Sequence, residues 1–236
     1  MRRWRGLSHD KPKRWTAKQW QYWTAEALHQ PRIDLFIRVF EQSESQIRVH
    51  LNTINQNPSV RAYDAPEWAQ RRSNVTGLED LKTLVLLLIL QRPAIAVETG
   101  VSAGATAAVI LDAVAKSPDG RLYSVDVDRP YAHEYGELIP PDCRKHWTLR
   151  LQGENPVLPD LLEEIGEIDF FFHDSIHSFR QMTWEYELAW QYLRSGGVLA
   201  SHDVHASTAF MDFKASHDAE ILDGGHIGAT GFWIKK

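Results

Sequence analysis

Short apolar runs alternate with stretches of helical periodicity over the C-terminal two thirds of the chain. The runs begin near residues 94, 122, 147, 168 and 197, and each is short enough to be a buried β-strand. Between the last two runs, apolar side chains recur at helical spacing from Met182 to Leu193. Strands and helices in this alternation predict an α/β protein with an open, mostly parallel sheet covered by helices on both faces.

A longer apolar run, Leu84–Leu90, precedes the first predicted strand and is bounded by Lys82 and Arg92. A membrane-spanning helix needs about 20 apolar residues, so this run predicts a buried helix packed on the sheet and not a membrane anchor. The single cysteine, Cys143, excludes a disulfide within the chain and suits a reducing compartment. We therefore expect a cytoplasmic protein.

The turn after the first predicted strand contains Glu98, Gly100, Ser102 and Gly104. Two glycines four positions apart suit a tight β-to-α turn, because glycine adopts strained dihedral angles and allows a ligand to approach the backbone. The turn differs from the dinucleotide fingerprint Gly-x-Gly-x-x-Gly, and the Glu98 carboxylate would repel a pyrophosphate. The pattern therefore favours a cationic ligand without phosphate.

Polar side chains also follow the other predicted strands. Asp126 lies about 26 residues after Gly100, where an acidic residue typically accepts hydrogen bonds from ribose hydroxyls. Ligands of parallel α/β sheets bind at the carboxyl ends of the strands, so every strand end contributes candidates. The further candidates at these ends are Glu154 and Asn155 after the third run, Asp174 after the fourth, and His202 and Asp203 after the fifth.

Six motifs follow one another between about residue 76 and residue 236, namely Val97–Gly104, Ser124–Asp126, Gly153–Asn155, Phe172–Phe179, Leu193–Asp203 and Gly228–Lys236. Through them, the chain resembles the class I S-adenosylmethionine-dependent methyltransferases. It is most similar to the group that contains macrolide-sugar O-methyltransferases and cephalosporin-hydroxylase-like proteins. The resemblance implies a Rossmann-like doubly wound sheet with an antiparallel last strand, S-adenosylmethionine as cofactor, and a small-molecule acceptor with a hydroxyl group.

The resemblance also assigns residues to the cofactor. Glu98 and Gly100 would line the methionine moiety, and Asp126 would accept both ribose hydroxyls. Glu154 and Asn155, after the third strand, would flank the adenine. The complete implied set is Glu98, Gly100, Ser102, Gly104, Asp126, Glu154, Asn155 and Asp174.

An alcohol acceptor must lose a proton during methyl transfer, and either a metal ion or a general base assists that loss. The resemblance implies His177 as the base, with Asp174 beside it, and a divalent cation held by Asp174, His202 and Asp203. The family has a carboxylate where this chain has His202. An imidazole ligand shifts the preference from Mg²⁺ toward Mn²⁺ or another transition metal, and it also makes metal-independent catalysis conceivable.

Two other functions remain open. His202-Asp203-x-His205 is similar to part of the facial triad of iron oxygenases, although the strand–helix alternation argues against their β-rich scaffold. The other is a non-catalytic protein that keeps the nucleoside pocket and binds a partner through its basic N-terminus.

Residues 1–40 carry a net charge of +6, against −11 for the remainder, and include four tryptophans. Basic residues interleaved with aromatics suit nucleic acid, but no RNA-module signature is present, so we do not expect nucleic-acid binding. We instead divide the chain into a helical cap, lid or dimerisation segment at 1–75 and a methyltransferase domain at 76–236. Helices near 16–29 and 31–42, separated at Pro31, would lie beside the crevice of the same chain or of a partner in a homo-oligomer. Trp20, Trp23 or Phe36 would then face the acceptor.

Overall fold

A computed structural model describes residues 25–64, 76–128, 135–153 and 156–236. Four residues of the predicted site and cap, Trp20, Trp23, Glu154 and Asn155, lie outside these ranges. The helices are α2 (Ala25–Phe40), α3 (Glu44–Ile54), α4 (Pro58–Asp64), α6 (Leu78–Gln91), α7 (Ala105–Val114), α8 (Leu158–Ile165), α9 (Phe179–Tyr192) and α10 (Ala209–Ser216), with short 3₁₀ helices at Arg144–His146 and Asp218–Glu220. The strands are β1 (Ile95–Thr99), β2 (Arg121–Val127), β3 (Trp147–Gln152), β4 (Ile168–His173), β5 (Leu193–Ser201), β6 (Ile221–Ile227) and β7 (Thr230–Lys235).

The strands form one seven-stranded sheet in the order β3-β2-β1-β4-β5-β7-β6. The first five strands are parallel, and β7 runs antiparallel to both β5 and β6. This architecture confirms the predicted doubly wound sheet with an antiparallel last strand. The sequence did not indicate β6, because Gly224 and Gly225 interrupt its pattern where its register with β7 shifts.

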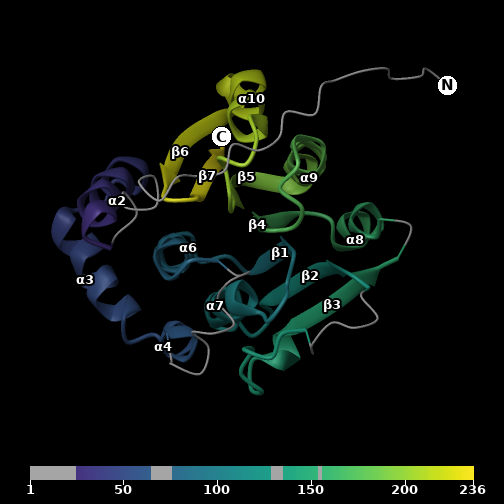
Figure 1. Ribbon diagram of the computed structural model, residues 1–236, viewed down its shortest axis with the longest axis horizontal. Coiled ribbons are helices and arrows are strands. Elements are labelled where there is room, and N and C mark those ends of the chain that lie inside the picture. The colour runs from purple at the N-terminus through teal and green to yellow at the C-terminus, as the bar shows by residue number, and fades with distance from the viewer. Residues whose placement is uncertain (1–24, 65–75, 129–134, 154–155) are drawn as a thin grey trace.

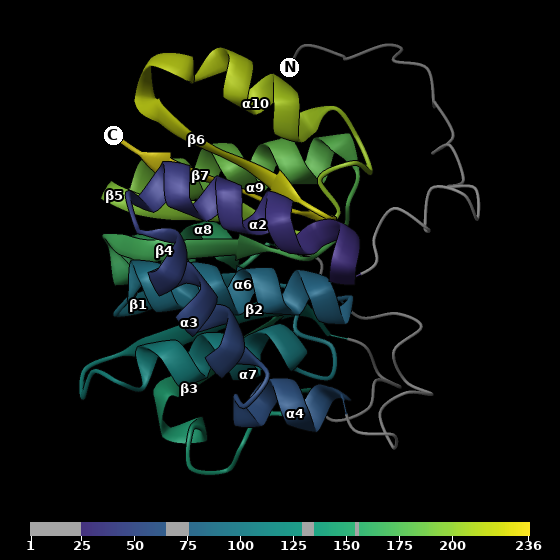
Figure 2. The same cartoon turned by 90° about the vertical axis from the view of Figure 1, so that its left-hand side faces the viewer.

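Helices cover both faces of the sheet (Figure 1). On one face, α6 and α7 pack on the parallel strands and α2 packs on β6 and β7, while α3 and α4 lie outside α6 and α7; Figure 2 shows this face from the outside. On the other face, α8, α9 and α10 enclose a second apolar core. The predicted buried helix over Leu84–Leu90 is α6, whose residues from Leu84 to Leu88 are buried. Within the described ranges, no helix is long and apolar enough to cross a membrane.

The prediction that Pro31 separates two helices is wrong, since α2 continues through it. Proline in a helix interior removes one hydrogen bond and costs about 3 kcal/mol. Pro31 itself lies on the exposed face of α2. The opposite face buries Ile33 and Phe36 completely, and the Phe36 ring lies 5.6 Å from that of Phe232 in β7. Tertiary packing therefore outweighs the local signal. Phe36 belongs to the core and does not face an acceptor.

Polar contacts also hold α2 against the body of the protein. The buried Arg32 guanidinium donates to the Thr83 hydroxyl at 3.0 Å and pairs with the Glu79 carboxylate of α6 at 3.1 Å. Removing residues 1–40 would therefore remove part of the hydrophobic core together with the Arg32 contacts to α6. A deletion that tests the role of the N-terminus has to stop before Ala25.

Gly100 allows two strand ends to approach each other closely. Its φ is +84°, and a Cβ added there would lie 2.1 Å from the Asp174 carbonyl oxygen. Gly100→Ala is therefore expected to lower the free energy of unfolding by about 2–5 kcal/mol, through backbone strain and overpacking. Urea unfolding measures the loss. Gly153→Ala is the control, because nothing lies within 4 Å of its added Cβ. Equal effects of the two variants would contradict the steric argument.

Candidate active site

The backbone carries the candidate residues of two neighbouring strands to one place. The hydrogen-bond pattern of the sheet continues past the strand ends, because the Asp174 N–H donates to Thr99 O and the His202 N–H donates to His173 O, each at 2.9 Å. Asp174 thus follows β4 beside the end of β1, and His202 follows β5 beside the end of β4. The predicted convergence at the carboxyl edge of the sheet is observed.

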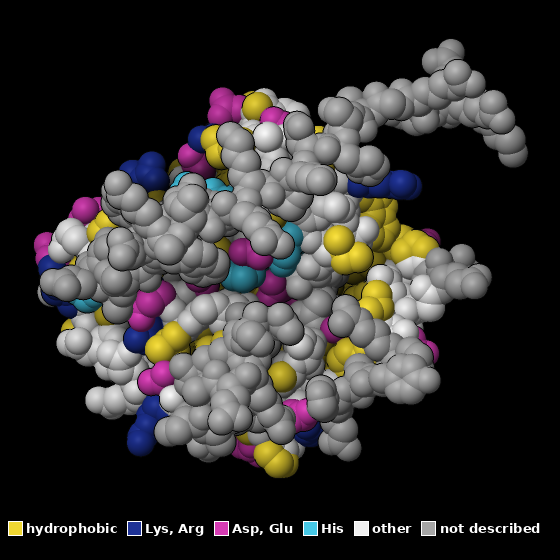
Figure 3. Space-filling model, viewed as in Figure 1, with side chains coloured by type: hydrophobic (Ala, Val, Ile, Leu, Met, Phe, Trp, Pro, Cys, Tyr) yellow, Lys and Arg dark blue, Asp and Glu magenta, His cyan; other side chains and the backbone are white. Residues whose placement is uncertain are grey.

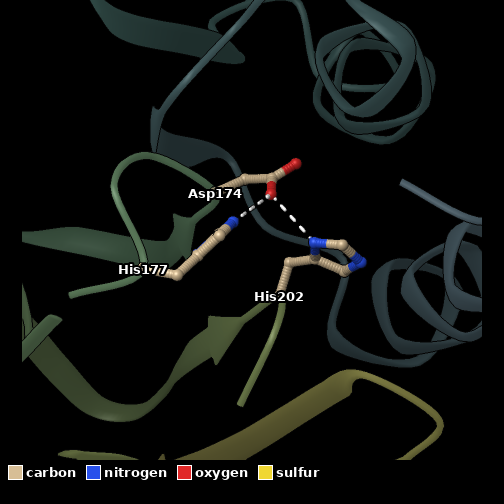
Figure 4. A group of neighbouring side chains, drawn as sticks. All are labelled: Asp174, His177 and His202. Carbon is tan, nitrogen blue, oxygen red and sulfur yellow. Dashed lines mark ion pairs between the residues drawn. The ribbon is translucent and has the colours of Figure 1, made fainter. Parts of the chain in front are cut away.

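Asp174 lies between two imidazole rings (Figure 4). Its Oδ1 is 3.0 Å from His202 Nδ1 and 3.7 Å from His177 Nε2. Its other oxygen, Oδ2, accepts a hydrogen bond from the Thr76 hydroxyl at 2.9 Å. One donor atom from each of Asp174, His177 and His202 lies within 4.8 Å of the others, so the three are close enough to share one ion.

Asp203 completes the group from its exposed side. Its Oδ2 is 3.5 Å from His177 Nε2, and its Oδ1 is 3.9 Å from His202 Nδ1. The Asp203 side chain is 47% exposed, against 11% for His202, so it forms the rim of the site. Figure 3 shows histidine and acidic side chains together near the centre of one face. Asp203 also has a φ of +48°, a strained conformation that often marks functional positions.

Burial and the two carboxylates give the histidines different pKa values. Burial lowers the pKa of His177 below its ordinary value, and the Asp174 and Asp203 carboxylates only partly oppose this. Burial alone would also lower the pKa of His202, but Asp174 outweighs it and raises the pKa to about 9. Burial opposes ionisation of Asp174, yet His202 holds its pKa below the ordinary value. At neutral pH the site therefore holds an ionised Asp174 beside a neutral His177.

The group is suited to a divalent cation. His202 Nδ1 is fully buried and has no well-directed hydrogen bond from any described residue, although Asp174 Oδ1 is close enough for an ion pair. Ligand atoms with bonds of about 2.1 Å lie about 3–4 Å apart, as Asp174 Oδ1 and His202 Nδ1 do here at 3.0 Å, and Asp203 Oδ1 lies 3.9 Å from the same His202 nitrogen. His177 Nε2 is close enough to be either a fourth ligand or a free base.

His205 does not join this group. Its ring packs at 4.5 Å against His226, and its Nε2 contacts the Gly228 carbonyl at 3.2 Å. The structure places His177 beside Asp174 and His202 instead. The oxygenase hypothesis, which used His202, Asp203 and His205, therefore gains no support.

On the neighbouring strands, Asp126 organises the glycine turn. Its Oδ2 accepts from the backbone N–H groups of Val101 and Ser102, at 2.7 and 3.0 Å, and its Oδ1 accepts from Val127 N–H at 2.7 Å. A carboxylate has about four acceptor positions, so capacity for a hydroxyl donor remains. The turn itself has positive φ at Gly100, Ser102 and Gly104, which brings it close to the strand ends.

Glu98 lies beneath this turn and is fully buried. Its carboxyl oxygens accept hydrogen bonds from the Ser124 hydroxyl at 2.7 Å and the Thr106 hydroxyl at 3.2 Å. Burial raises the pKa of Glu98 to about 8, because these two hydrogen bonds compensate only part of the lost hydration. The Glu98 side chain therefore links β1 to β2 through Ser124 and to α7 through Thr106.

The raised pKa of Glu98 predicts a pH-dependent stability. Unfolded, the group loses its proton near pH 4.5, whereas folded it keeps the proton up to about pH 8. Between these values the unfolded state binds fewer protons, so the free energy of unfolding should fall by up to about 1.4 kcal/mol per pH unit. Glu98→Gln should remove this slope. Urea unfolding of both proteins between about pH 5 and about pH 8 checks it, and parallel curves would contradict the prediction.

Three further residues, which are not among the predicted site residues, support the site. Thr76 contacts Asp174, and His173 and Glu185 form a buried pair with 2.6 Å between Nδ1 and Oε2. The signal for Glu185 was its position in α9, where it interrupts the otherwise apolar stripe of Met182 and Tyr186. A charged residue on a buried helix face calls for a partner.

Comparisons with known proteins agree with this fold. Residues 97–204 match the family model of a methyltransferase domain, and a comparison with curated proteins gave no match. An O-methyltransferase from Bacillus cereus, solved in complex with SAH, is 17% identical, with a TM-score of 0.51 over 91% of this chain and 99% of that one. A putative caffeoyl-CoA O-methyltransferase from Staphylococcus aureus is 13% identical, with a TM-score of 0.59 over 78% and 95%. Residues 97–204 are thus similar to a methyltransferase domain, and the sheet has the fold of these two O-methyltransferases.

Proposed function

We propose that the protein is an O-methyltransferase that transfers a methyl group from S-adenosylmethionine to a hydroxyl of a small molecule, such as a sugar or another natural product. One observation carries the proposal. The imidazole of His177 lies within 4 Å of two carboxylates, those of Asp174 and Asp203, at the ends of the strands, and burial lowers its pKa. An alcohol acceptor requires a group that takes its proton, and a neutral histidine can do this at physiological pH.

The residues around the turn suit the methyl donor. Gly100, Ser102 and Gly104 would form the backbone surface on which it lies, and Asp126 has acceptor capacity for its ribose hydroxyls. Glu98 is too deeply buried to line this surface with its side chain, so we propose that it supports the turn instead. When bound, S-adenosylmethionine supplies a methyl group already activated by its sulfonium.

The chain's own residues then have to align the acceptor and remove its proton. His177 Nε2 would accept the proton from the hydroxyl as the oxygen attacks the methyl carbon in line with the leaving sulfur. Asp174 and Asp203 stabilise the resulting imidazolium, since both lie within 4 Å of this nitrogen. Asp174, His202 and Asp203 would hold a divalent cation, which when bound polarises the acceptor oxygen.

Binding measurements test the donor part of the proposal. S-adenosylmethionine and SAH should bind in about the micromolar range, near −8 kcal/mol, and NAD should not bind. Asp126→Ala should weaken SAH binding by about 1–3 kcal/mol, because the turn loses the carboxylate that fixes two of its N–H groups. Calorimetry measures these affinities. Tight NAD binding without a response to S-adenosylmethionine would overturn the proposal.

The acceptor is tested by turnover. The protein is incubated with S-adenosylmethionine carrying an isotopically labelled methyl group, and with sugars and phenols that differ in one hydroxyl. A labelled methyl ether that requires that hydroxyl supports O-methyl transfer. Label on nitrogen or carbon instead would contradict it.

A further inference from the structure

A continuous line of polar contacts runs from the buried interior to His177. Glu185 Oε2 lies 2.6 Å from His173 Nδ1, and His173 Nε2 lies 3.4 Å from His177 Nδ1. Glu185 and His173 are almost completely buried, with 3% and 0% of their side chains exposed. The far nitrogen of His177, Nε2, is the one that faces Asp174 and Asp203.

The direction of each hydrogen bond in this line follows from Glu185, the first residue of the line. The Glu185 carboxylate also accepts from the Thr99, Ser175 and Gln181 side chains, at 2.5, 2.7 and 2.8 Å. With donors on both oxygens, it acts only as an acceptor, so His173 Nδ1 must carry a hydrogen. With its hydrogen on Nδ1, the His173 ring offers Nε2 as the acceptor for the Nδ1–H of His177, 3.4 Å away. That leaves the lone pair of His177 on Nε2.

We infer that Glu185 and His173 are positioning residues that hold His177 as the Nδ1–H tautomer, with Nε2 unprotonated toward Asp174 and Asp203. This rests on the proposed function in one respect, namely that the lone pair on Nε2 serves the reaction as a base or as a metal ligand. A histidine whose second nitrogen is fixed by a hydrogen bond keeps its tautomer and its ring orientation. Without that bond, the proton is free to move to Nε2, where it blocks either role.

The packing around the pair agrees with a positioning role. The His173 ring meets the rings of His177 and Tyr186 edge to face, at 5.4 and 5.5 Å. Glu185 comes from α9, and His173 is the last residue of β4, so the line crosses from a helix to the sheet. Burial raises the pKa of Glu185, but the contact with His173 and the other donors brings it below the ordinary value. Burying a carboxylate is costly unless it is paired and hydrogen-bonded, and His173 with the three other donors satisfies both oxygens of Glu185.

The tautomer is directly measurable in the protein as it exists. Nitrogen-15 NMR of the histidine-labelled wild type distinguishes protonated from unprotonated ring nitrogens, and the signals missing from His177→Ala assign the His177 ring. Near neutral pH, without donor or metal, we expect Nδ1–H with a bare Nε2. A wild-type His177 protonated on Nε2 would overturn the inference, whatever the variants do.

Three variants then test the function of the line. His173→Phe keeps the ring volume but removes the acceptor for His177 Nδ1–H. Glu185→Gln keeps the shape, but its amide can donate as well as accept, so it no longer requires a hydrogen on His173 Nδ1. We expect His173→Phe to move His177 toward the Nε2–H tautomer and to lower kcat about 10–100-fold, with SAH affinity retained. Glu185→Gln should give a smaller loss. Tyr186→Phe is the matched control, because Tyr186 is equally buried and its hydroxyl bonds to Ser201, outside the line.

Two outcomes separate this inference from the proposed function. If His173→Phe shifts the tautomer of His177 but the wild type transfers no methyl group, the positioning role of the pair stands and the proposed O-methyl transfer is overturned. A loss of activity in Tyr186→Phe as large as in His173→Phe, with the same tautomer in all variants, would show that the pair only packs, and would overturn the inference.

Discussion

Replacing His177 with alanine is expected to slow methyl transfer about 10²–10⁴-fold while SAH still binds with nearly wild-type affinity. The reason is geometric. His177 Nε2 lies 3.5 Å from Asp203 and 3.7 Å from Asp174, whereas Asp126 and the glycine turn belong to other strands. The variant therefore loses the proton acceptor and keeps the residues that we assign to the donor. Single-turnover rates and calorimetry with SAH measure the two effects separately.

His205→Ala is the matched control for this variant. His205 is also a histidine after β5, but its ring packs against that of His226, and it is not among the residues whose ligand atoms lie within 4.8 Å of one another. Its rate should stay close to that of the wild type. Measuring metal affinity in His177→Ala distinguishes two roles of His177. If His177 is a metal ligand, the variant loses metal affinity together with rate, and if His177 is a base, the variant loses rate alone. A fall in SAH affinity that matches the fall in rate would instead make His177 a structural residue.

The strands and the carboxylates at their ends were predictable from the sequence because their signals are local. Each buried strand is a short apolar run, and parallel strands bring their carboxyl ends to one edge, so Asp126, Asp174 and Asp203 had to lie along it. The same logic applied to His202, which follows β5 directly. What the pattern could not indicate was which atoms would meet. The 3.0 Å contact between Asp174 and His202 depends on side-chain directions that the register alone does not determine.

The parts that the sequence did not predict depend on contacts between distant segments. Proline normally ends a helix, but Ile33 and Phe36 carry α2 across Pro31 because they pack on β7 and its neighbours, far along the chain. The pair of Glu185 and His173 is likewise invisible to periodicity, since one residue lies in a helix and the other at a strand end. Local rules describe each of these segments by itself, and the packing partner decides the outcome.

Removal of divalent cations is expected to lower turnover at least about tenfold, and Mn²⁺ is expected to restore it at lower concentration than Mg²⁺. The reason lies in the donor set, in which the buried Nδ1 of His202 takes a place where an oxygen would favour Mg²⁺. Asp174→Asn should abolish the response to added metal, because the amide keeps the contact with Thr76 but removes the charge that binds the ion. Asp203→Asn should do the same from the rim of the site.

Asp212→Asn provides the control for these substitutions. Asp212 also accepts a hydrogen bond from a threonine, Thr208 at 2.8 Å, but it lies in α10 and not in the group around Asp174. The measurement is the rate of methyl transfer by chelator-treated protein as each metal is titrated back, together with calorimetry of Mn²⁺ alone. Turnover that is unchanged after chelation would contradict the metal site. His177, with its tautomer held by His173, would then have to remove the acceptor's proton without the help of a cation.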